Sequence, residues 1–374
     1  MTQFVIRDVG NVKLEDFENV SFTPNFFTRE EVNEYLLMAE AYQVFKELKE
    51  IVSPLKCYDW FVEEDLLIST SPTSRPGKIY TKLVLKLAKL LEQHSFFIEA
   101  LDIYRKISVT PARERQVRLM HRLNEPEEAR ALAEEILENP YNQSEALFAG
   151  DFLKSGTKRI KRSTTVSLKA ADEILLVKDP QLSVEKQAVA YFRAEGYEAY
   201  HTENSLWRLL FGLLFWEETY DTDQSTFHHP LQRLPSDIHD QSFYEKRADS
   251  IEAKLRKIRT KKALVRKLVD TFEAKTGIVN QYVYWSEDLL DLAITAIDLL
   301  PLKGLKEVLK MISIQVKSNS TGFPDLFIFK GKKYHFYEIK SPTDQLSAQQ
   351  LFWIDFMTKW NIKADVLKVG WAER

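Results

Sequence analysis

The sequence predicts a multi-domain protein with a helical N-terminal half and an α/β C-terminal half. Two observations carry this prediction. In the first half, apolar residues recur at helical spacing and at a constant offset, which is typical of stacked helix pairs. In the second half, two strand-like runs flank a turn that contains Gly331.

Composition is that of an ordinary globular protein. The chain has 374 residues, enough for two or three domains, with 44% hydrophobic and 29% charged residues. The single cysteine, Cys57, excludes an internal disulfide and a thiolate zinc site and favours a reducing compartment. Residues 1–8 show no secretory signal, and no apolar run is long enough to span a membrane. We therefore expect an intracellular protein, of the cytoplasm or nucleoid in a bacterium and of the nucleus in a eukaryote.

The first region, residues 1–75, is expected to hold a strand-like lead-in and a helix. A capping box, Thr28-Arg29-Glu30-Glu31, marks the start of that helix, which runs through Lys49. The Ser/Pro/Gly-rich loop at 69–77 marks a boundary.

The second region, residues 76–180, is predicted to be a TPR-like helical-repeat domain. Stacks of this kind form concave surfaces that bind proteins or nucleic-acid backbone. Arg113 and Arg115, with Arg118 and Arg122, are either phosphate-binding or simple surface residues. The repeat matches Leu90 with Leu119, Leu91 with Met120, Ala100 with Ala129, Ile103 with Leu132 and Ile107 with Ile136.

The third region, residues 181–374, is predicted to be the α/β domain. An amphipathic helix opens near Ser183 and ends at Gly196, and a short strand then leads to Glu203. Taken alone, Glu203 could merely favour the positive end of the next helix. Helices follow as an insertion at about 220–320, then the hairpin, a helix capped by Ser347 and Gln350, and a strand at 364–369.

The hairpin places charges on an apolar surface. If Gly331-Lys332 form a two-residue loop, Phe329 pairs with Tyr334. In the same register Asp325 faces Glu338, and alternation puts Lys340 on the same face. Charges inside a helix-covered sheet require a reason.

Metal-assisted phosphodiester hydrolysis is a chemical reason for this grouping. Asp325, Glu338 and a backbone carbonyl, that of Ile339, form a hard oxygen site suited to Mg²⁺ or Mn²⁺. Lys340 would orient or polarise the attacking water. Pro324-Asp325 followed by Glu338-Ile339-Lys340 has the form of the PD-(D/E)xK nuclease motif. The alternative is a plain hairpin with a solvated Asp at one end and a Glu/Lys pair at the other.

Residues 322–367 resemble the VRR-NUC domain, and upstream segments resemble the Fanconi-anaemia-associated nucleases. The upstream likeness rests on the stretches at 200–207, 210–216, 243–258 and 111–115. The resemblance implies a restriction-endonuclease-like fold and a structure-specific DNA nuclease of 5′-flap endonuclease and 5′-to-3′ exonuclease type, used in crosslink repair. It implies catalytic roles for Asp325, Glu338 and Lys340, a metal-site role for Glu203 and a match of Gln350 to a glutamine on the following helix. Longer members carry an upstream SAP-containing region that we expect this chain to lack.

DNA binding requires local basicity, because the net charge is −3. Two segments supply it: the loop with Lys158, Arg159, Lys161 and Arg162, and a helix-like run in which Lys254, Lys257 and Lys261 share a face. The alternative for each is a solvated surface.

The sequence leaves three hypotheses about function. The first is a metal-dependent nuclease whose partner is branched or 5′-flap DNA. The second is a helical-repeat scaffold that binds branched DNA or partner proteins without cutting. The third, an RNA nuclease, shares the metal chemistry of the first.

Overall fold

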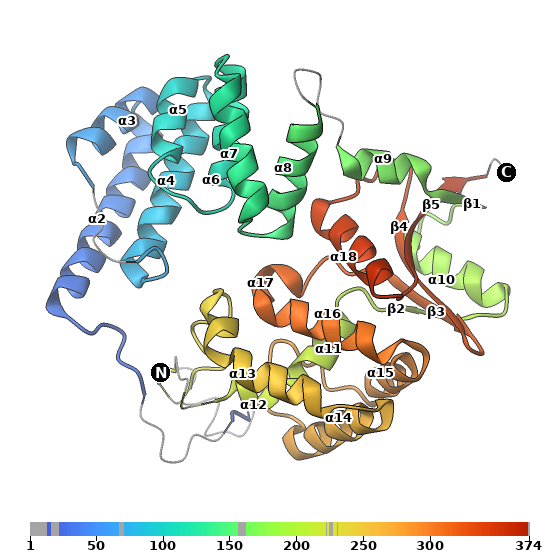
Figure 1. Cartoon of the computed structure of the whole chain (residues 1–374). Helices are drawn as coiled ribbons and strands as arrows, with labels where there is room; N and C mark the ends of the chain where they lie inside the picture. The colour runs from blue at the N-terminus through green and yellow to red at the C-terminus, as the bar shows by residue number, and fades with distance from the viewer. Residues whose placement is uncertain are drawn as a thin grey trace. The chain divides into compact units, whose positions relative to one another are not determined.

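The computed structural model describes residues 13–15, 22–66, 71–155, 162–221, 223, 227–229 and 231–372. It divides into two compact units, one of residues 24–162 and one of residues 1–23 with 163–374 (Figure 1). No helix in these described ranges is long and apolar enough to cross a membrane.

The unit of residues 24–162 is helical. Thr28 caps its first helix by accepting a hydrogen bond from the Glu31 amide, which confirms the predicted helix start. Ser53 and Ser74 cap the next two helices in the same way. Its helices are α2 (Arg29–Ile51), α3 (Pro54–Glu63), α4 (Arg75–Gln93), α5 (Phe97–Tyr104), α6 (Ala112–Arg122), α7 (Pro126–Glu138) and α8 (Gln143–Ser155).

Helices α4 with α5 and α6 with α7 correspond to the two pairs that the repeat predicts. Ala100 and its match Ala129 are both fully buried, and Ile107 and its match Ile136 are buried as well. A small residue at the same place in each pair lets neighbouring helices approach closely. The TPR-like character of the repeat stays a prediction.

The second unit is built on a five-stranded mixed sheet of order β1-β5-β4-β3-β2. Strand β5 runs parallel to both β1 and β4, whereas β3 is antiparallel to β4 and β2. The strands are β1 (Asp172–Leu176), β2 (Glu198–His201), β3 (Leu326–Lys330), β4 (Lys333–Lys340) and β5 (Ala364–Trp371).

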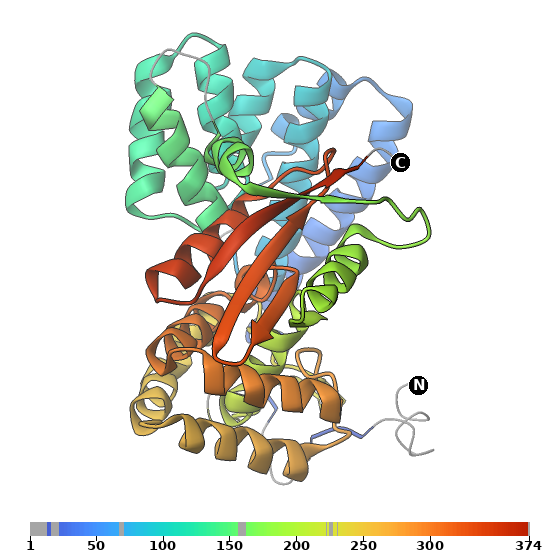
Figure 2. The same ribbon diagram turned by 90° about the vertical axis from the view of Figure 1, so that its right-hand side faces the viewer.

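Helices cover both faces of this sheet, and a series of helices lies between β2 and β3 in the sequence. Figures 1 and 2 show α10 on one face of the sheet and α18 on the other. The helices of the unit are α9 (Ser163–Ala170), α10 (Val184–Ala194), α11 (Ser205–Leu214), α12 (Trp216–Thr219), α13 (Ser242–Lys257), α14 (Lys261–Lys275), α15 (Glu287–Leu299), α16 (Leu302–Ile314), α17 (Val316–Asn319) and α18 (Ala348–Lys359).

The two sheet faces have different cores. On the α10 side, Ala188 and Phe192 pack against aliphatic strand residues such as Ile328 and Ile339. On the opposite side aromatic rings dominate: Phe327 stacks on Phe336 with ring centroids 4.6 Å apart. Asp325, Glu338 and Lys340 belong by strand alternation to this aromatic face.

Two elements differ from the sequence prediction. Strand β1 lies upstream of residue 181, the predicted start of the α/β region, and pairs with β5. The basic run expected as one helix is two, because Thr260 caps a new helix at Lys261. Lys254 and Lys257 therefore lie on α13 and Lys261 on α14.

Candidate active site

The hairpin of β3 and β4 has the predicted register. Phe329 pairs with Tyr334 and Lys330 with Lys333, and Gly331 has a φ of +60°, which favours glycine at the first position of the turn. Because Leu326 pairs with Tyr337, the next residues outward, Asp325 and Glu338, oppose each other. The Ile339 amide donates a 2.8 Å hydrogen bond to Asp325 Oδ2.

Glu338 has one oxygen that is satisfied and one that is not. Its side chain is only 1% exposed, and Oε1 accepts hydrogen bonds from Lys340 Nζ at 2.8 Å and from Gln350 Nε2 at 2.5 Å. Oε2 is buried with no hydrogen-bond partner in the described part of the chain. A buried carboxylate oxygen without a partner is costly unless a proton or a cation occupies it.

Gln350 connects this site to the start of α18. It completes the predicted capping box with Ser347, whose amide donates to Gln350 Oε1 at 2.9 Å. The same Oε1 accepts a hydrogen bond from Lys340 Nζ at 3.2 Å, while Nε2 donates to Glu338. One side chain therefore orients the carboxylate and the lysine together.

Burial perturbs both carboxylates. It raises the pKa of Asp325 to about 6, opposed by the hydrogen bond from the Ile339 amide. Burial raises the pKa of Glu338 to about 8, with a further contribution from the charge of Asp325. Paired acids with pKa values displaced in this way are typical of functional sites.

Glu203 lies at the junction of β2 and α11. Its amide and that of Thr202 donate to the Asp325 carbonyl at 3.0 and 2.9 Å, so the backbone of Glu203 is fixed beside Asp325. Its φ of +40° is in the left-handed region, which is uncommon for a residue other than glycine. The side chain is exposed and accepts a hydrogen bond from Asn204 Nδ2 at 2.9 Å.

The donor set fits a hard divalent cation. Asp325 and Glu338 supply carboxylate oxygens at one end of the sheet, and Glu338 Oε2 is an oxygen in need of a partner. Across the described residues, no three His, Cys, Asp or Glu side chains already stand together as a metal cluster. The metal-site role of Glu203, like that of the Ile339 carbonyl, stays a prediction.

The segment that precedes Asp325 is held on both sides by tryptophans. Trp353 of α18 stacks on Phe323 at 4.1 Å, and Trp207 of α11 stacks on it at 5.2 Å. The indole of Trp353 donates to the Thr321 carbonyl, and Arg208 Nε donates to the Ser320 carbonyl. Helices α11 and α18 thus fix the approach to Asp325.

Comparison with known proteins agrees with this geometry. The VRR-NUC domain family matches residues 259–371. The chain is 28% identical over 99% of its length to the Fanconi-associated nuclease 1 homolog of Pseudomonas aeruginosa, and 32% identical over 50% of its length to that of Schizosaccharomyces pombe. A crystal structure of paFAN1 bound to 5′-flap DNA with a gap superposes on the whole chain with a TM-score of 0.81 and 26% identity. The resemblance to the Fanconi-associated nucleases is confirmed.

The chain does not span these relatives completely. It covers 66% of the bacterial Fanconi-associated nuclease homolog, 27% of the yeast one and 68% of the protein in the crystal structure. The helical N-terminal region and the mixed α/β domain are the architecture that it shares with the crystallised Fanconi-associated nuclease.

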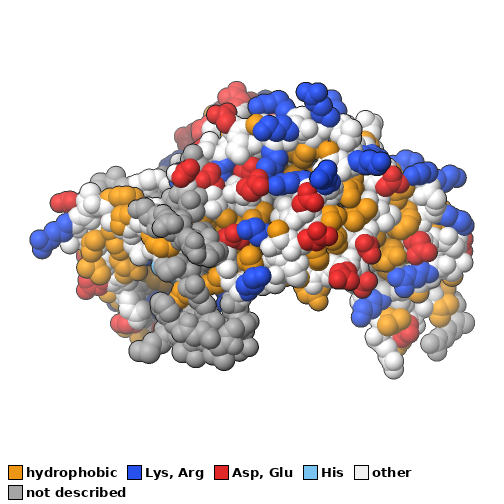
Figure 3. All heavy atoms as spheres, turned by 90° about the horizontal axis from the view of Figure 1, so that it is seen from below, with side chains coloured by type: hydrophobic (Ala, Val, Ile, Leu, Met, Phe, Trp, Pro, Cys, Tyr) orange, Lys and Arg blue, Asp and Glu red, His pale blue; other side chains and the backbone are white. Residues whose placement is uncertain are grey.

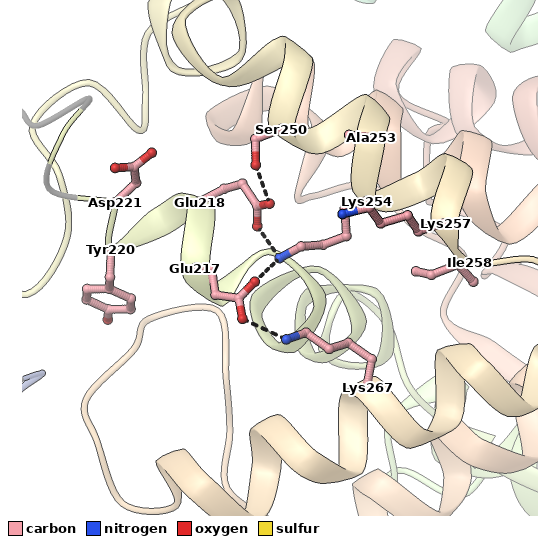
Figure 4. A pocket seen from close by; sticks show the side chains of 10 residues that line it. All are labelled: Glu217, Glu218, Tyr220, Asp221, Ser250, Ala253, Lys254, Lys257, Ile258 and Lys267. Atoms are coloured by element: carbon pink, nitrogen blue, oxygen red, sulfur yellow. Dashed lines mark hydrogen bonds and ion pairs between the residues drawn. The ribbon is translucent and has the colours of Figure 1, made fainter.

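Lys254, predicted to bind DNA, is enclosed by acids of its own unit. Its side chain is 14% exposed, and Nζ lies 2.7 Å from Glu217 and 2.6 Å from the buried Glu218 (Figure 4). Lys267 pairs with the other oxygen of Glu217 at 2.7 Å. These ion pairs lower the pKa of Glu217 to about 2, chiefly through its hydrogen bonds to the two lysines. The two glutamates and the two lysines of these ion pairs line a cavity of about 650 Å³.

Arg113 and Arg115, the repeat-domain candidates, also form ion pairs with carboxylates of their own unit. Arg113 is buried and binds Glu145 through two nitrogens, at 2.6 and 3.2 Å. Arg115 is paired with Glu92. The ion pairs to buried carboxylates argue against a free phosphate-binding role for Arg113 and Lys254, and DNA binding by these two residues stays a prediction. These carboxylates lie far away in the sequence, and the basic runs carry no sign of them.

The remaining cationic candidates are more accessible. Lys257 and Arg162 are exposed, and Lys261 donates to the Asp298 carbonyl while remaining half-buried. Lys158, Arg159 and Lys161 lie outside the described residues. On the face shown in Figure 3, cationic and acidic side chains are interspersed rather than separated into one basic stripe.

Proposed function

We propose that this chain is a metal-dependent nuclease that hydrolyses phosphodiester bonds in branched or 5′-flap DNA, with interstrand crosslink repair as its biological setting. The observation that carries the proposal is the grouping of Asp325, Glu338 and Lys340 on one sheet face with Glu338 Oε2 buried and unpartnered. A sheet that needed only stability would not retain these charges among aromatic rings.

Asp325 and Glu338 are the residues that would hold Mg²⁺ or Mn²⁺, with the Ile339 carbonyl and Glu203 as further donors. When bound, the cation activates a water molecule and neutralises charge that develops on the phosphate. The raised pKa of Glu338 means that this carboxylate gives up a proton as the cation binds.

Lys340 is placed to orient the attacking water. Two of the three N–H donors of its ammonium group are directed at Glu338 Oε1 and Gln350 Oε1. The third is available to a water or a phosphate oxygen. Because Glu338 and Gln350 fix the position of Nζ, little reorganisation is needed when the substrate arrives.

The choice of DNA as substrate rests on relatives. The matched proteins of Pseudomonas aeruginosa and Schizosaccharomyces pombe are named Fanconi-associated nuclease homologs, and the superposed structure holds 5′-flap DNA. The second solved structure holds 5′-flap DNA with a shorter flap. These likenesses favour branched DNA over RNA.

The test is incubation of the protein with labelled 5′-flap, duplex and single-stranded DNA and with RNA of the same sequence, in Mg²⁺, Mn²⁺ or EDTA. We expect cleavage of the flap substrate with either cation, none in EDTA and none with Asp325→Ala. Asp59→Ala, which removes an exposed acid on α3, is the control and should cut normally. Binding of flap DNA without cleavage in any cation would identify a scaffold instead, and preferential cleavage of RNA would contradict the substrate class.

A further inference from the structure

Asn204 occupies an unusual place beside the acidic residues. It is the N-cap residue of α11, a position where asparagine normally accepts a hydrogen bond from an amide of the first helical turn. Here its φ of −86° and ψ of −15° are helical, and its side chain makes no capping bond. The helix start is secured by Ser205, whose amide donates to the Thr202 carbonyl at 2.8 Å.

The Asn204 amide group instead joins two parts of the site. Its Nδ2 donates to Glu203 Oε1 at 2.9 Å, and its Oδ1 accepts a hydrogen bond from the Phe323 amide at 3.3 Å. Phe323 is two residues before Asp325 and is held between Trp207 and Trp353. Asn204 therefore ties the side chain of Glu203 to the rigid segment that carries Asp325.

We propose that Asn204 is a positioning residue that orients Glu203 for cation binding. This inference rests on the proposed function. Glu203 is exposed and would otherwise sample several rotamers, and fixing a ligand beforehand reduces the entropy lost when the cation binds. The amide engages Oε1 alone, so the second oxygen of Glu203 is left to the cation.

The left-handed backbone of Glu203 supports this role. With a φ of +40° the residue lies in a sparsely populated region of backbone conformation. It is held there by the hydrogen bonds that its own amide and the Thr202 amide donate to the Asp325 carbonyl. The backbone thus fixes where the Glu203 side chain starts, and Asn204 fixes where its carboxylate lies.

The test uses Mn²⁺ alone as the probe and measures its dissociation constant by calorimetry in wild type, Asn204→Ala and Asn204→Ser. Asn204→Ser keeps a small polar residue at the helix start but lacks the amide bridge, and urea unfolding of each variant measures what the loss of the Phe323 hydrogen bond costs the fold. We expect both variants to bind Mn²⁺ on the order of 10-fold more weakly, the usual scale for losing a group that orients a ligand.

The same substitutions in a Glu203→Ala background separate positioning from a general structural effect. If Asn204 acts through Glu203, Asn204→Ala should weaken Mn²⁺ binding no further once Glu203 is gone. Unchanged Mn²⁺ affinity in the single variants, or an equal loss in the Glu203→Ala background, would overturn the inference while the proposed function stands. Failure of wild type to bind Mn²⁺, or full binding by Asp325→Ala, would overturn the proposed function itself.

Discussion

Glu338 Oε2 has opposite consequences for stability and for the cation binding that we propose. A buried oxygen without a hydrogen-bond partner destabilises the fold, and the same oxygen is the strongest feature of the site for a divalent cation. The folded protein keeps a proton on Glu338 up to a pH of about 8, whereas an ordinary glutamate ionises near pH ~4.3. Stability and cation binding should therefore both depend on the protonation of this residue.

Glu338→Gln should stabilise the cation-free protein increasingly as the pH rises. The unfolded wild type ionises Glu338 above pH ~4, while the folded form does not, so stability present at low pH is lost as pH rises toward about 8. Glutamine has no such proton to lose and can still accept from Lys340 and Gln350. Urea unfolding in EDTA between pH 5 and 9 measures the effect, with the exposed Glu134→Gln as control. A stability difference that does not change with pH would contradict the assignment of this pKa to Glu338.

At the scale of elements, the start of α18 and the pair Glu338 and Lys340 share the side chain of Gln350. The capping box could be predicted because serine and glutamine three positions apart satisfy orphan amides in any helix. The hairpin register was predictable for a similar reason, since Gly331 and strand alternation act locally. Local rules do not reach Lys254, which is neutralised by Glu217 and Glu218 from another helix.

Gln350→Glu should separate capping from catalysis. Glutamate also completes a capping box, so the helix start survives, but it cannot donate to Glu338 and places a second charge beside it. We expect cleavage to fall ~10- to 100-fold, on the scale of lost orienting groups. Gln350→Ala should lose both functions and about 1 kcal/mol of stability, the scale of a lost cap. Cleavage rates and urea unfolding of the two variants provide the measurement, and equal destabilisation by both would show that the glutamate does not cap.

The basic residues of α13 and α14 should fall into two classes, exposed residues that contact DNA and a half-buried lysine that stabilises the fold. Neutralising the exposed Lys257, Lys262 and Arg266 together should flatten the dependence of log affinity on log salt by up to ~2.7 units, about 0.9 for each phosphate that the protein no longer neutralises. Lys254→Ala should leave that slope unchanged but destabilise the fold by ~3–5 kcal/mol, because the buried Glu218 is left without its cation. Fluorescence anisotropy across a salt series, with urea unfolding, distinguishes them. An unchanged slope in the triple variant would assign the exposed cations to a solvated surface.

At the scale of the whole molecule, the chain consists of one unit with the site and one without it. The sequence predicted both kinds of structure but not the limits of the sheet, because β1 is a short edge strand with mostly exposed side chains. Its five residues, two of them acidic, lack the longer apolar runs and the glycine turn that marked the hairpin. It is recognised only through its pairing with β5.

Cation binding should therefore stabilise the unit that contains the sheet and leave the stability of the helical unit of residues 24–162 unchanged. At a Mn²⁺ concentration 100 times the dissociation constant, mass action adds about 2.7 kcal/mol to the unit that binds it. We expect calorimetry to show an upward shift in one transition of wild type and a much smaller one in Asp325→Ala. Asp325→Ala in EDTA should be as stable as wild type or slightly more so, since it removes a carboxylate whose charged form is disfavoured by burial. Equal Mn²⁺ shifts in the two proteins would exclude Asp325 as a ligand.

The helices that lie between β2 and β3 in the sequence also separate the synthesis of Glu203 from that of Asp325 and Glu338. The Asn204–Phe323 hydrogen bond joins residues 119 positions apart, and contacts of such long range form late in folding. A ribosome makes about 5–20 residues per second and releases N-terminal segments first. Glu203 thus emerges well before Asp325 and Glu338, and the nascent chain has no complete acidic site while the intervening helices are made. A fragment that stops within α16 could fold some of its helices yet would lack Asp325, Glu338 and Lys340.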